Sequence, residues 1–328
     1  MVRFGIIGTN FITETFLEGA ALCPEFKLEA VYSRTLERGR EFGEKYGAPH
    51  IFTDLDEMIE SGKIDAVYIA SPTSLHHRHT LKFLEAGIGV LCEKPLGSNL
   101  REVREMVETS ERKGVLLMEA IRTLHNPNYG VIRENLGRIG KIRGVYANFC
   151  QYSSRYDKFR EGVVLNAFLP QFSNGSTMDI GLYPFYFVLG LFGKPEGISS
   201  YGTVLGSGVD GAGTALLKYG DMVATVNHSK INSSTLPSEI TGEEGSIVIE
   251  KISLLERVTL KLRNGQEEEL TIEREKNDMY YEIREFLDCY SRGEHESRDN
   301  PHSNSLLVAE IMEKARKEIG VTFPADQI

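Results

Sequence analysis

The first third of the chain alternates short apolar runs with longer amphipathic segments. The runs are apolar on both faces, which is typical of parallel strands covered by helices on either side. Five such runs stand out: VRFGIIG from residue 2, KLEAVYS from 27, IDAVYIAS from 64, GIGVLCE from 87 and VLLMEA from 115. The segments between them have helical spacing, and several end in glycine. This alternation predicts an α/β fold with a doubly wound parallel sheet.

After about residue 137 the pattern changes to apolar and polar positions in strict alternation. Clear examples are KIRGVYANFCQY from 141, GTALLKYG from 213 and DMVATVNHSKI from 221. A period of two predicts antiparallel strands with one buried face, and the pairs Gly220-Asp221 and Asn264-Gly265 predict hairpin turns. Two helical stretches close the chain. The second part is therefore predicted to be an α+β domain with a large, mostly antiparallel open sheet.

The chain of 328 residues exceeds the size at which a single core keeps growing, so we expect two domains. The change of pattern predicts limits of 1–122 and 123–328, with the terminal helix able to pack back on the first domain. Because no flexible linker separates them, we expect the domains to meet tightly and to share a cleft.

Composition excludes several classes of partner. The formal net charge of -10 argues against nucleic acid, whose binding depends on clustered Lys and Arg. The four cysteines are scattered, which suits reduced thiols rather than a disulfide framework. No apolar run is long enough for a membrane span, and a strand rather than a signal segment follows Met1. We therefore expect a cytoplasmic protein with no nucleic-acid or membrane partner.

The turn after the first strand is a candidate nucleotide site, because ligands of open parallel sheets bind outside the carboxyl ends of the strands. Gly8-Thr9-Asn10-Phe11-Ile12 stands where dinucleotide-binding turns carry Gly-x-Gly-x-x-Gly. Gly8 can make the tight turn. Asn10 replaces the second glycine, and we expect it to adopt a left-handed backbone and to contact phosphate through its amide. A buried strand followed by a helix, without a ligand, is the alternative.

The end of the second strand bears on the choice of cofactor. NAD-binding folds place an acid there to bind the ribose 2'-hydroxyl, but this chain reads Tyr32-Ser33-Arg34. Arg34 and Arg38 are four residues apart and would share a helix face, so both guanidinium groups can meet a 2'-phosphate. A solvated helix surface is the alternative. NADP is favoured, and NAD stays possible.

Two further strand ends carry candidate residues. Ser71-Pro72 follows one buried strand, and Glu93-Lys94-Pro95 ends the next. A Glu-Lys pair at the end of a buried strand directs charge toward the ligand side of the sheet, and the proline fixes the chain after it. A solvated charge pair is the alternative.

Three histidines, His76, His77 and His79, crowd the start of one helix. Further ligands at a suitable spacing are missing from the sequence around them, so we predict no metal site. We expect them on the helix surface, with His76 facing the cofactor.

A second cluster lies in STMDIGLYPF, residues 176 to 185. Asp179 and Tyr183 are four residues apart and would project from the same side of a helix start. Asp179 as a helix cap and Tyr183 as a core residue are the alternatives. Pro184 limits how far upstream that helix begins, since proline is tolerated only in the first turn.

The ordered motifs resemble the Gfo/Idh/MocA oxidoreductase family. They are VRFGIIGTNFIT, YIASPTSLHHRHTLKFLEAG, VLCEKPLG, LLMEAIRTLHNP and STMDIGLYPF, and the resemblance continues to the terminal GVTFPAD. It implies a nicotinamide cofactor bound by a Rossmann domain and an open sheet in the second domain that often builds oligomers. It also implies that Lys94 lies beside the nicotinamide, often before a cis proline.

Tyr183 stands where many family members have histidine, which makes the chain similar to the dimeric dihydrodiol dehydrogenase and NADP-dependent D-xylose dehydrogenase branch. The departures at Asn10, Thr13 and residues 122–125 leave the substrate open. We expect an NADP(H)-dependent enzyme that acts on a small sugar, polyol or vicinal diol as a homodimer or homotetramer. The alternatives are a catalytically silent regulatory protein of the same fold and an NAD-dependent glycoside-cleaving enzyme.

Oxidation of an alcohol requires removal of a hydride and of a proton. The reference pKa of tyrosine is about 10, but a nearby cation typically lowers the pKa of an acid by one to three units. We therefore expect Tyr183 as acid/base, Lys94 as its electrostatic partner and Asp179 as the group that orients the substrate hydroxyl or the lysine. Lys94 as the proton carrier is the rival assignment.

Overall fold

The computed structural model describes residues 1–327, and their contacts divide the chain into two compact units. The first unit comprises Met1–Gly97, Arg101–Ile121 and Glu275–Ser305. The second comprises Ser98–Leu100, Arg122–Arg274 and the chain from Leu306 onward. The chain thus leaves the first unit, builds most of the second, returns to the first over Glu275–Ser305, and enters the second again from Leu306.

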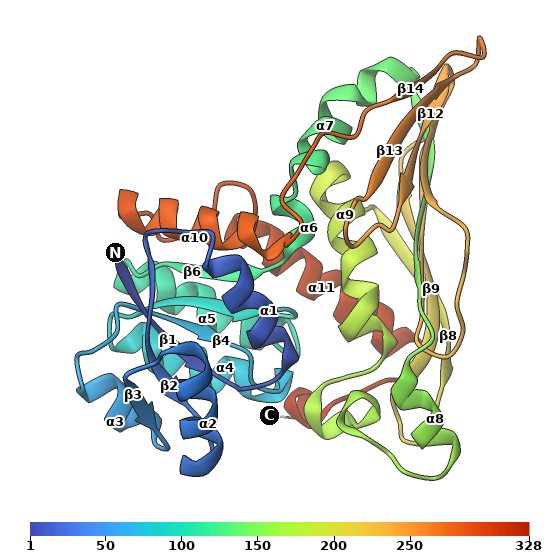
Figure 1. The fold of residues 1–328 in the computed structure, drawn as a ribbon. Coiled ribbons are helices and arrows are strands. Elements are labelled where there is room, and N and C mark those ends of the chain that lie inside the picture. Colours follow the sequence, from blue (N-terminus) through green and yellow to red (C-terminus); the bar gives the residue numbers. More distant parts are fainter. Residues whose placement is uncertain (328) are drawn as a thin grey trace. The chain divides into compact units, whose positions relative to one another are not determined.

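The first unit is built on a six-stranded parallel sheet in the order β3-β2-β1-β4-β5-β6 (Figure 1). The strands are β1 (Val2–Ile7), β2 (Phe26–Tyr32), β3 (His50–Phe52), β4 (Ala66–Ile69), β5 (Gly89–Glu93) and β6 (Leu117–Ala120). The strand order reverses between β1 and β4, which confirms the predicted doubly wound α/β fold. The sequence pattern missed β3, because three residues are too few to show a period.

Helices cover this sheet and connect its strands. They are α1 (Phe11–Ala20), α2 (Leu36–Tyr46), α3 (Leu55–Glu60), α4 (Thr73–Glu85), α5 (Leu100–Lys113) and the returning α10 (Met279–Arg292). α10 contacts α1, although more than 250 residues separate their sequences.

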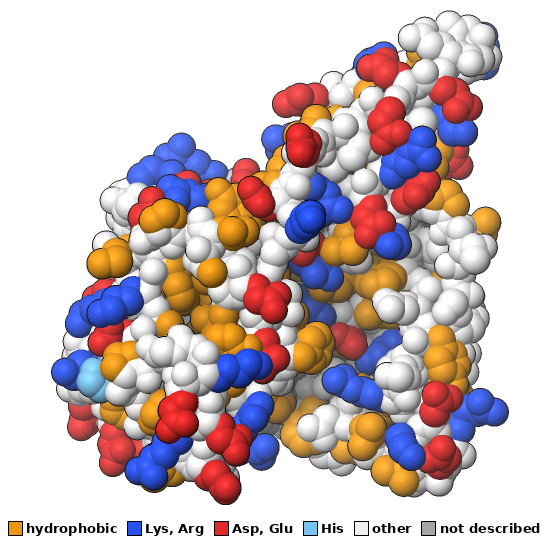
Figure 2. Space-filling model, in the orientation of Figure 1, with side chains coloured by type: hydrophobic (Ala, Val, Ile, Leu, Met, Phe, Trp, Pro, Cys, Tyr) orange, Lys and Arg blue, Asp and Glu red, His pale blue; other side chains and the backbone are white. Residues whose placement is uncertain are grey.

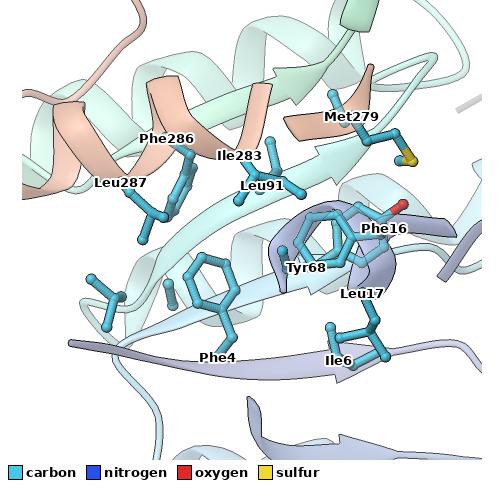
Figure 3. Close-up of a cluster of buried hydrophobic side chains, with 14 of the residues drawn as sticks. Phe4, Ile6, Phe16, Leu17, Tyr68, Leu91, Met279, Ile283, Phe286 and Leu287 are labelled. Atoms are coloured by element: carbon cyan, nitrogen blue, oxygen red, sulfur yellow. The ribbon is translucent and has the colours of Figure 1, made fainter. Parts of the chain in front are cut away.

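A cluster of aromatic and aliphatic side chains joins α10 to the sheet (Figure 3). Phe286 of α10 meets Phe4 of β1 with ring centroids 5.4 Å apart. On the same side of the sheet, Phe16 of α1 stacks on Tyr68 of β4 at 3.8 Å. All four rings are completely buried. Because burying one large apolar side chain contributes about 1.5–3 kcal/mol, α10 is an integral part of this core.

The second unit is built on an eight-stranded sheet in the order β14-β13-β12-β11-β7-β10-β9-β8. The strands are β7 (Ile142–Cys150), β8 (Gly197–Val204), β9 (Asp210–Tyr219), β10 (Met222–Ser229), β11 (Ser238–Gly242), β12 (Gly245–Glu250), β13 (Arg257–Leu262) and β14 (Glu267–Glu269). Only the β7–β10 pair is parallel in this sheet of the described chain, so the predicted mostly antiparallel sheet is confirmed. The hairpins predicted at Gly220-Asp221 and Asn264-Gly265 join β9 to β10 and β13 to β14.

Helices and short turns complete the second unit. They are α6 (Arg122–His125), α7 (Pro127–Asn135), α8 (Ser154–Arg160), α9 (Leu182–Phe192), most of α11 (His302–Glu318), a π-helical turn (Thr177–Gly181), and 3₁₀ turns at Leu136–Ile139, Asn166–Phe168, Pro170–Phe172 and Pro324–Gln327. α9 contacts β7 and β10, and its residues from Leu182 to Leu189 are all buried. On β9, Leu217 is buried whereas its neighbour Leu216 is 44% exposed, so the other face of the sheet is open.

The surface carries charges of both signs. On the face shown in Figure 2, Lys and Arg side chains are interspersed with Asp and Glu side chains over both units. This distribution lacks the one-sided basic patch that a phosphate backbone attracts. Among residues 1–327, no helix is long and apolar enough to cross a membrane.

Candidate active site

The turn after β1 requires a glycine. Gly8 has φ +106°, and a Cβ atom on it would lie 2.6 Å from the carbonyl oxygen of Ala70, which follows β4. The backbone at the end of β1 therefore passes directly beside the end of β4. The strand order of the sheet reverses between these two strands, and open parallel sheets bind their ligands at such a point.

Asn10 closes this turn as the N-cap of α1. Its Oδ1 accepts hydrogen bonds from the backbone of Ile12 at 3.1 Å and of Thr13 at 3.3 Å, and its Nδ2 donates to Ala70 O. Its φ of -99° is extended, so the left-handed backbone expected here is wrong. The hydroxyl of Thr13 donates to Gly8 O at 3.1 Å, which ties the helix start to the turn where a third glycine would allow close packing. Phe11, the first residue of α1, is 68% exposed beside it.

The end of β2 presents two arginines, but not on one helix face. α2 begins at Leu36, so Arg34 lies before the helix, and the expected shared face is wrong. Arg34 is exposed, and Ser33 beside it is buried. Arg38 donates from Nη2 to Thr9 O at 2.9 Å and from Nε to Thr9 Oγ1 at 3.3 Å. Arg38 therefore holds the glycine turn from the side of β2.

The surface position expected for His76 and His79 is wrong, because both side chains are buried and lie against the ends of β4 and β5. Both ring nitrogens of His76 lie against backbone carbonyls, Nε2 at 2.8 Å from Ser71 O and Nδ1 at 2.9 Å from Pro95 O. Burial lowers the pKa of His76, and the two backbone carbonyls act in the opposite direction. His79 faces the hydroxyl of Ser71 at 3.1 Å, and burial lowers its pKa to about 4. Pro72 stands at the N-cap position of α4.

The ring Nε2 of His77 lies 2.7 Å from Oε2 of Glu105. In the described part of the chain, no three His, Cys, Asp or Glu side chains gather as a metal site would require.

Glu93 and Lys94 at the end of β5 have different surroundings. Glu93 is buried and accepts a 2.5 Å hydrogen bond from the hydroxyl of Tyr68, whose pKa rises well above its usual value through burial and then through this carboxylate. Lys94 is half-buried, and the Lys94–Pro95 bond is cis, as the family resemblance implied. The backbone of Leu96 donates to Glu119 of β6 at 3.0 Å, which fixes the chain beyond the proline.

In the second unit, Asp179 lies in the π-helical turn Thr177–Gly181 that precedes α9. Gly181 occupies the N-cap position of α9, so the alternative of Asp179 as the cap of this helix is excluded. The carboxylate of Asp179 instead makes an ion pair with Lys230, whose Nζ lies 2.6 Å from Oδ2. Pro184 is the third residue of α9, within the first turn as expected.

Two buried side chains from the sheet anchor this turn. Asp210 of β9 accepts hydrogen bonds from Thr177 through the backbone N–H at 2.6 Å and through the hydroxyl at 2.8 Å. His228 of β10 lies 2.9 Å from the hydroxyl of Ser176, and burial lowers its pKa. π-helical turns are rare in proteins overall, and those that do occur are often found at functional sites. Asp179 thus lies on a turn that is fixed to the sheet at two points, by Asp210 and by His228.

Tyr183 is 7% exposed and packs between an aromatic ring and a cation. The ring of Phe149 meets it edge-on at 5.6 Å, and the guanidinium carbon of Arg122 lies 5.7 Å from its ring centroid. Arg122 and Phe149 also line a cavity of about 680 Å³ together with polar groups such as Asn148 and Gln151. Two side chains that contact the ring of Tyr183 thus also line this cavity of the second unit.

Comparison with known proteins identifies the family. Residues 2–121 match the Gfo/Idh/MocA oxidoreductase family with its NAD-binding Rossmann fold, and residues 135–248 match the Gfo/Idh/MocA C-terminal domain. The scyllo-inositol 2-dehydrogenase (NADP(+)) of Bacillus subtilis (strain 168) is 49% identical over 327 residues and covers all of both chains. The chain belongs to the Gfo/Idh/MocA oxidoreductase family. The predicted family and fold class are confirmed.

Other relatives of this Gfo/Idh/MocA chain are more distant. The trans-1,2-dihydrobenzene-1,2-diol dehydrogenase of Mus musculus is 33% identical over 342 residues, 99% of each chain. The crystal structure of KijD10, a 3-ketoreductase from Actinomadura kijaniata, with NADP and TDP-benzene superposes with a TM-score of 0.85. The superposition covers 98% of this chain and 99% of the KijD10 chain, with 24% sequence identity, which supports the fold.

Lys230, Asp210 and His228 were missed when the sequence was considered alone. One signal was present. The inward-facing positions of β10 are Met222, Ala224, Val226 and His228, and Lys230 continues the same parity beyond the strand end. A lysine in line with the buried face of a strand needs an acidic partner, because an unpaired buried charge is costly. The sequence therefore indicated an acid elsewhere in the chain.

Proposed function

We propose that this chain is an NADP(H)-dependent dehydrogenase or reductase that acts on the CH–OH group of a small polyol, sugar or vicinal diol. The observation that carries the proposal is the grouping of Asp179 and Tyr183 on one turn and the following helix start. The 49% identity to an NADP(+)-dependent inositol dehydrogenase over the whole chain supports the same activity.

The first unit fits a dinucleotide. A side chain at Gly8 would collide with Ala70, so only a glycine leaves backbone exposed to a diphosphate at the N-terminus of α1. The residues that would line the cofactor are Gly8, Thr9, Asn10, Phe11, Ile12, Ser33, Arg34, Arg38, Ser71, Pro72, Lys94 and Pro95. Glu93 and His76, which are buried, would shape these strand ends from behind.

NADP is preferred over NAD in this proposal. The chain after β2 offers the exposed guanidinium of Arg34 and no carboxylate at the position of a ribose-binding acid. Arg38 is held beside the same turn by Thr9, so a second cation supports a 2'-phosphate there.

For the reaction, we assign Tyr183 as the group that removes or returns the hydroxyl proton. Lys94 would stabilise the phenolate through its charge, and Asp179 would orient the substrate hydroxyl or the lysine. The bound nicotinamide supplies the hydride chemistry. Lys94 as the proton carrier is the rival that the experiment below tests.

The cavity of the second unit favours hydroxyl-rich substrates. Arg122, Asn148, Gln151 and Ser233 offer donors and acceptors along its wall. The two curated relatives act on an inositol and on a dihydrobenzene diol, both of which carry hydroxyl groups on a six-membered ring. We infer a cyclic polyol or diol, or a sugar of similar size.

We also propose that the enzyme is cytoplasmic and self-associates as a homodimer or homotetramer. The open face of β8, β9 and β10 exposes apolar side chains, with Tyr201 77%, Leu216 44% and Val223 48% exposed. A second copy of this face would cover them.

The proposal is tested by an absorbance screen of sugars, polyols and diols with NADP+ and NAD+ side by side. In the Tyr183→Phe variant we expect kcat to fall about a hundredfold or more, because the ring stays and only the proton-carrying hydroxyl is lost. Binding of NADPH should be unchanged, as measured by its fluorescence. If this variant kept the wild-type kcat, the role of proton carrier would be assigned to Lys94 instead of Tyr183.

The matched control is Tyr219→Phe. Tyr219 donates to Gly193 O at 2.9 Å, at the opposite end of α9 from Tyr183. Loss of this hydrogen bond costs about 1 kcal/mol of stability and should leave turnover unchanged.

A further inference from the structure

Lys230 is a buried lysine that the reaction scheme above does not use. Its side chain is 4% exposed, and its Nζ lies 2.6 Å from Oδ2 of Asp179, whose side chain is 31% exposed. The ammonium also lies 5.1 Å from the ring centroid of Phe168, which is completely buried. Lys230 thus stands behind Asp179, on the side away from solvent.

The backbone of Lys230 is fixed on both sides. Its N–H donates to Gly211 O at 2.8 Å, and its carbonyl accepts from Ser153 N at 2.9 Å. Gly211 belongs to β9, and Ser153 follows β7, so two neighbours of β10 in the sheet hold the lysine in register. Because the π-helical turn is anchored to β9 and β10 by Asp210 and His228, both ends of the ion pair are attached to the same sheet.

Stability alone does not explain a lysine at this position. A buried ion pair is often no more stabilising than apolar residues of similar volume, since both charges lose their hydration. The inward positions of β10 before it include Ala224 and Val226, which are completely buried and apolar. The next inward position, His228, is already polar and holds the π-helical turn through Ser176, and Lys230 continues from it to Asp179 of the same turn. The lysine therefore indicates a requirement placed on Asp179.

We propose that Lys230 is a positioning residue for catalysis: its ammonium fixes the orientation and charge of the Asp179 carboxylate, which in turn orients the substrate for proton transfer to Tyr183. This rests on the proposed function, in which Asp179 contacts substrate. The ammonium of Lys230 contacts the Asp179 carboxylate from its buried side and holds it in one orientation. Asp179 is the residue of the pair that contacts the substrate.

The test compares Lys230→Met with the wild-type enzyme. Methionine keeps most of the apolar stem but removes the charge. We expect kcat for the polyol to fall roughly 10- to 100-fold, the size typical when a group supporting a reacting residue is removed, while the KM for NADP+ stays unchanged. If the methionine variant does not fold, Lys230→Gln carries the same test. Lys230→Arg, which restores the charge, should recover part of the lost kcat.

Combination with Asp179→Asn separates a catalytic role from a structural one. If Lys230 acts through Asp179, the double variant Lys230→Met/Asp179→Asn should be no slower than Asp179→Asn alone. Equal losses from Lys230→Met in both backgrounds, or wild-type kcat in the single variant, would overturn the proposal. Full activity of Asp179→Asn would instead refute the role of Asp179 in the proposed function.

The matched control is Lys141→Met. Lys141 also pairs with an aspartate, Asp221, but the two side chains are 53% and 64% exposed. Exposed pairs contribute about 0–1 kcal/mol, so this variant should keep wild-type kcat and stability.

Discussion

At the residue scale, several side chains have tasks that their identity alone does not reveal. Asn10 caps α1 in an extended conformation, and Arg38 braces the glycine turn through Thr9. Arg34 is exposed and lies before α2. Of the two arginines, Arg34 is therefore the one that can be changed without disturbing the turn.

We predict that Arg34→Ala raises the KM for NADP+ about 10- to 100-fold, because a hydrogen bond to a charged group contributes about 1.5–3 kcal/mol. The KM for NAD+, which has no 2'-phosphate, should change little. Initial rates with both cofactors measure the two constants. Arg40→Ala, at an exposed arginine inside α2, is the control and should leave both unchanged. An equal rise for both cofactors would place Arg34 elsewhere than at the 2'-phosphate.

At the scale of elements, the core of the first unit depends on a helix from the far end of the chain. α10 supplies Met279, Ile283, Phe286 and Leu287 to the cluster in Figure 3. The π-helical turn of the second unit likewise depends on β9 and β10, which hold it through Asp210 and His228.

We predict that Phe286→Ala lowers the free energy of unfolding of the first unit by about 3–5 kcal/mol, since it leaves a cavity among fully buried rings. Urea unfolding followed by far-ultraviolet circular dichroism measures this, because the chain has no tryptophan to report by fluorescence. Ser291→Ala, at an exposed position of α10, should change stability by less than about 0.5 kcal/mol. A loss for Phe286→Ala no larger than that of Ser291→Ala would show that α10 is not part of this core in solution.

At the scale of the whole molecule, four buried histidines link stability to pH. Burial lowers the pKa of His76, His79, His228 and His302, so the unfolded chain binds more protons than the folded one below the usual pKa of about 6.5. This contribution is complete above that pH. It is lost as pH falls toward the folded value, which is about 4 for His79.

We predict that the thermal unfolding midpoint drops between pH 7.5 and pH 5.5. In His79→Gln the drop should be smaller, because one of the four groups no longer takes up a proton on unfolding. Scanning calorimetry at the two pH values measures both midpoints. A drop of the same size in the variant would assign the pH dependence to other groups.

The sequence by itself determined the two sheets, their hairpins, the glycine turn and the family. These features are local or periodic. Apolar runs, alternation and turn pairs state which face of an element is buried, and the ordered motifs around Lys94 and Asp179 identify the family. Its predictions failed at backbone details, namely the extended N-cap conformation of Asn10 and the start of α2 after Arg34.

Only the tertiary structure decided which distant side chains meet. Lys230 lies 51 positions beyond Asp179, and α10 follows more than 150 residues after β6, so no local pattern records either pairing. The physical reason is that a buried charge or a buried ring requires a partner without specifying where along the chain that partner lies. The sheet topology makes this choice when it brings the end of β10 to the turn that carries Asp179.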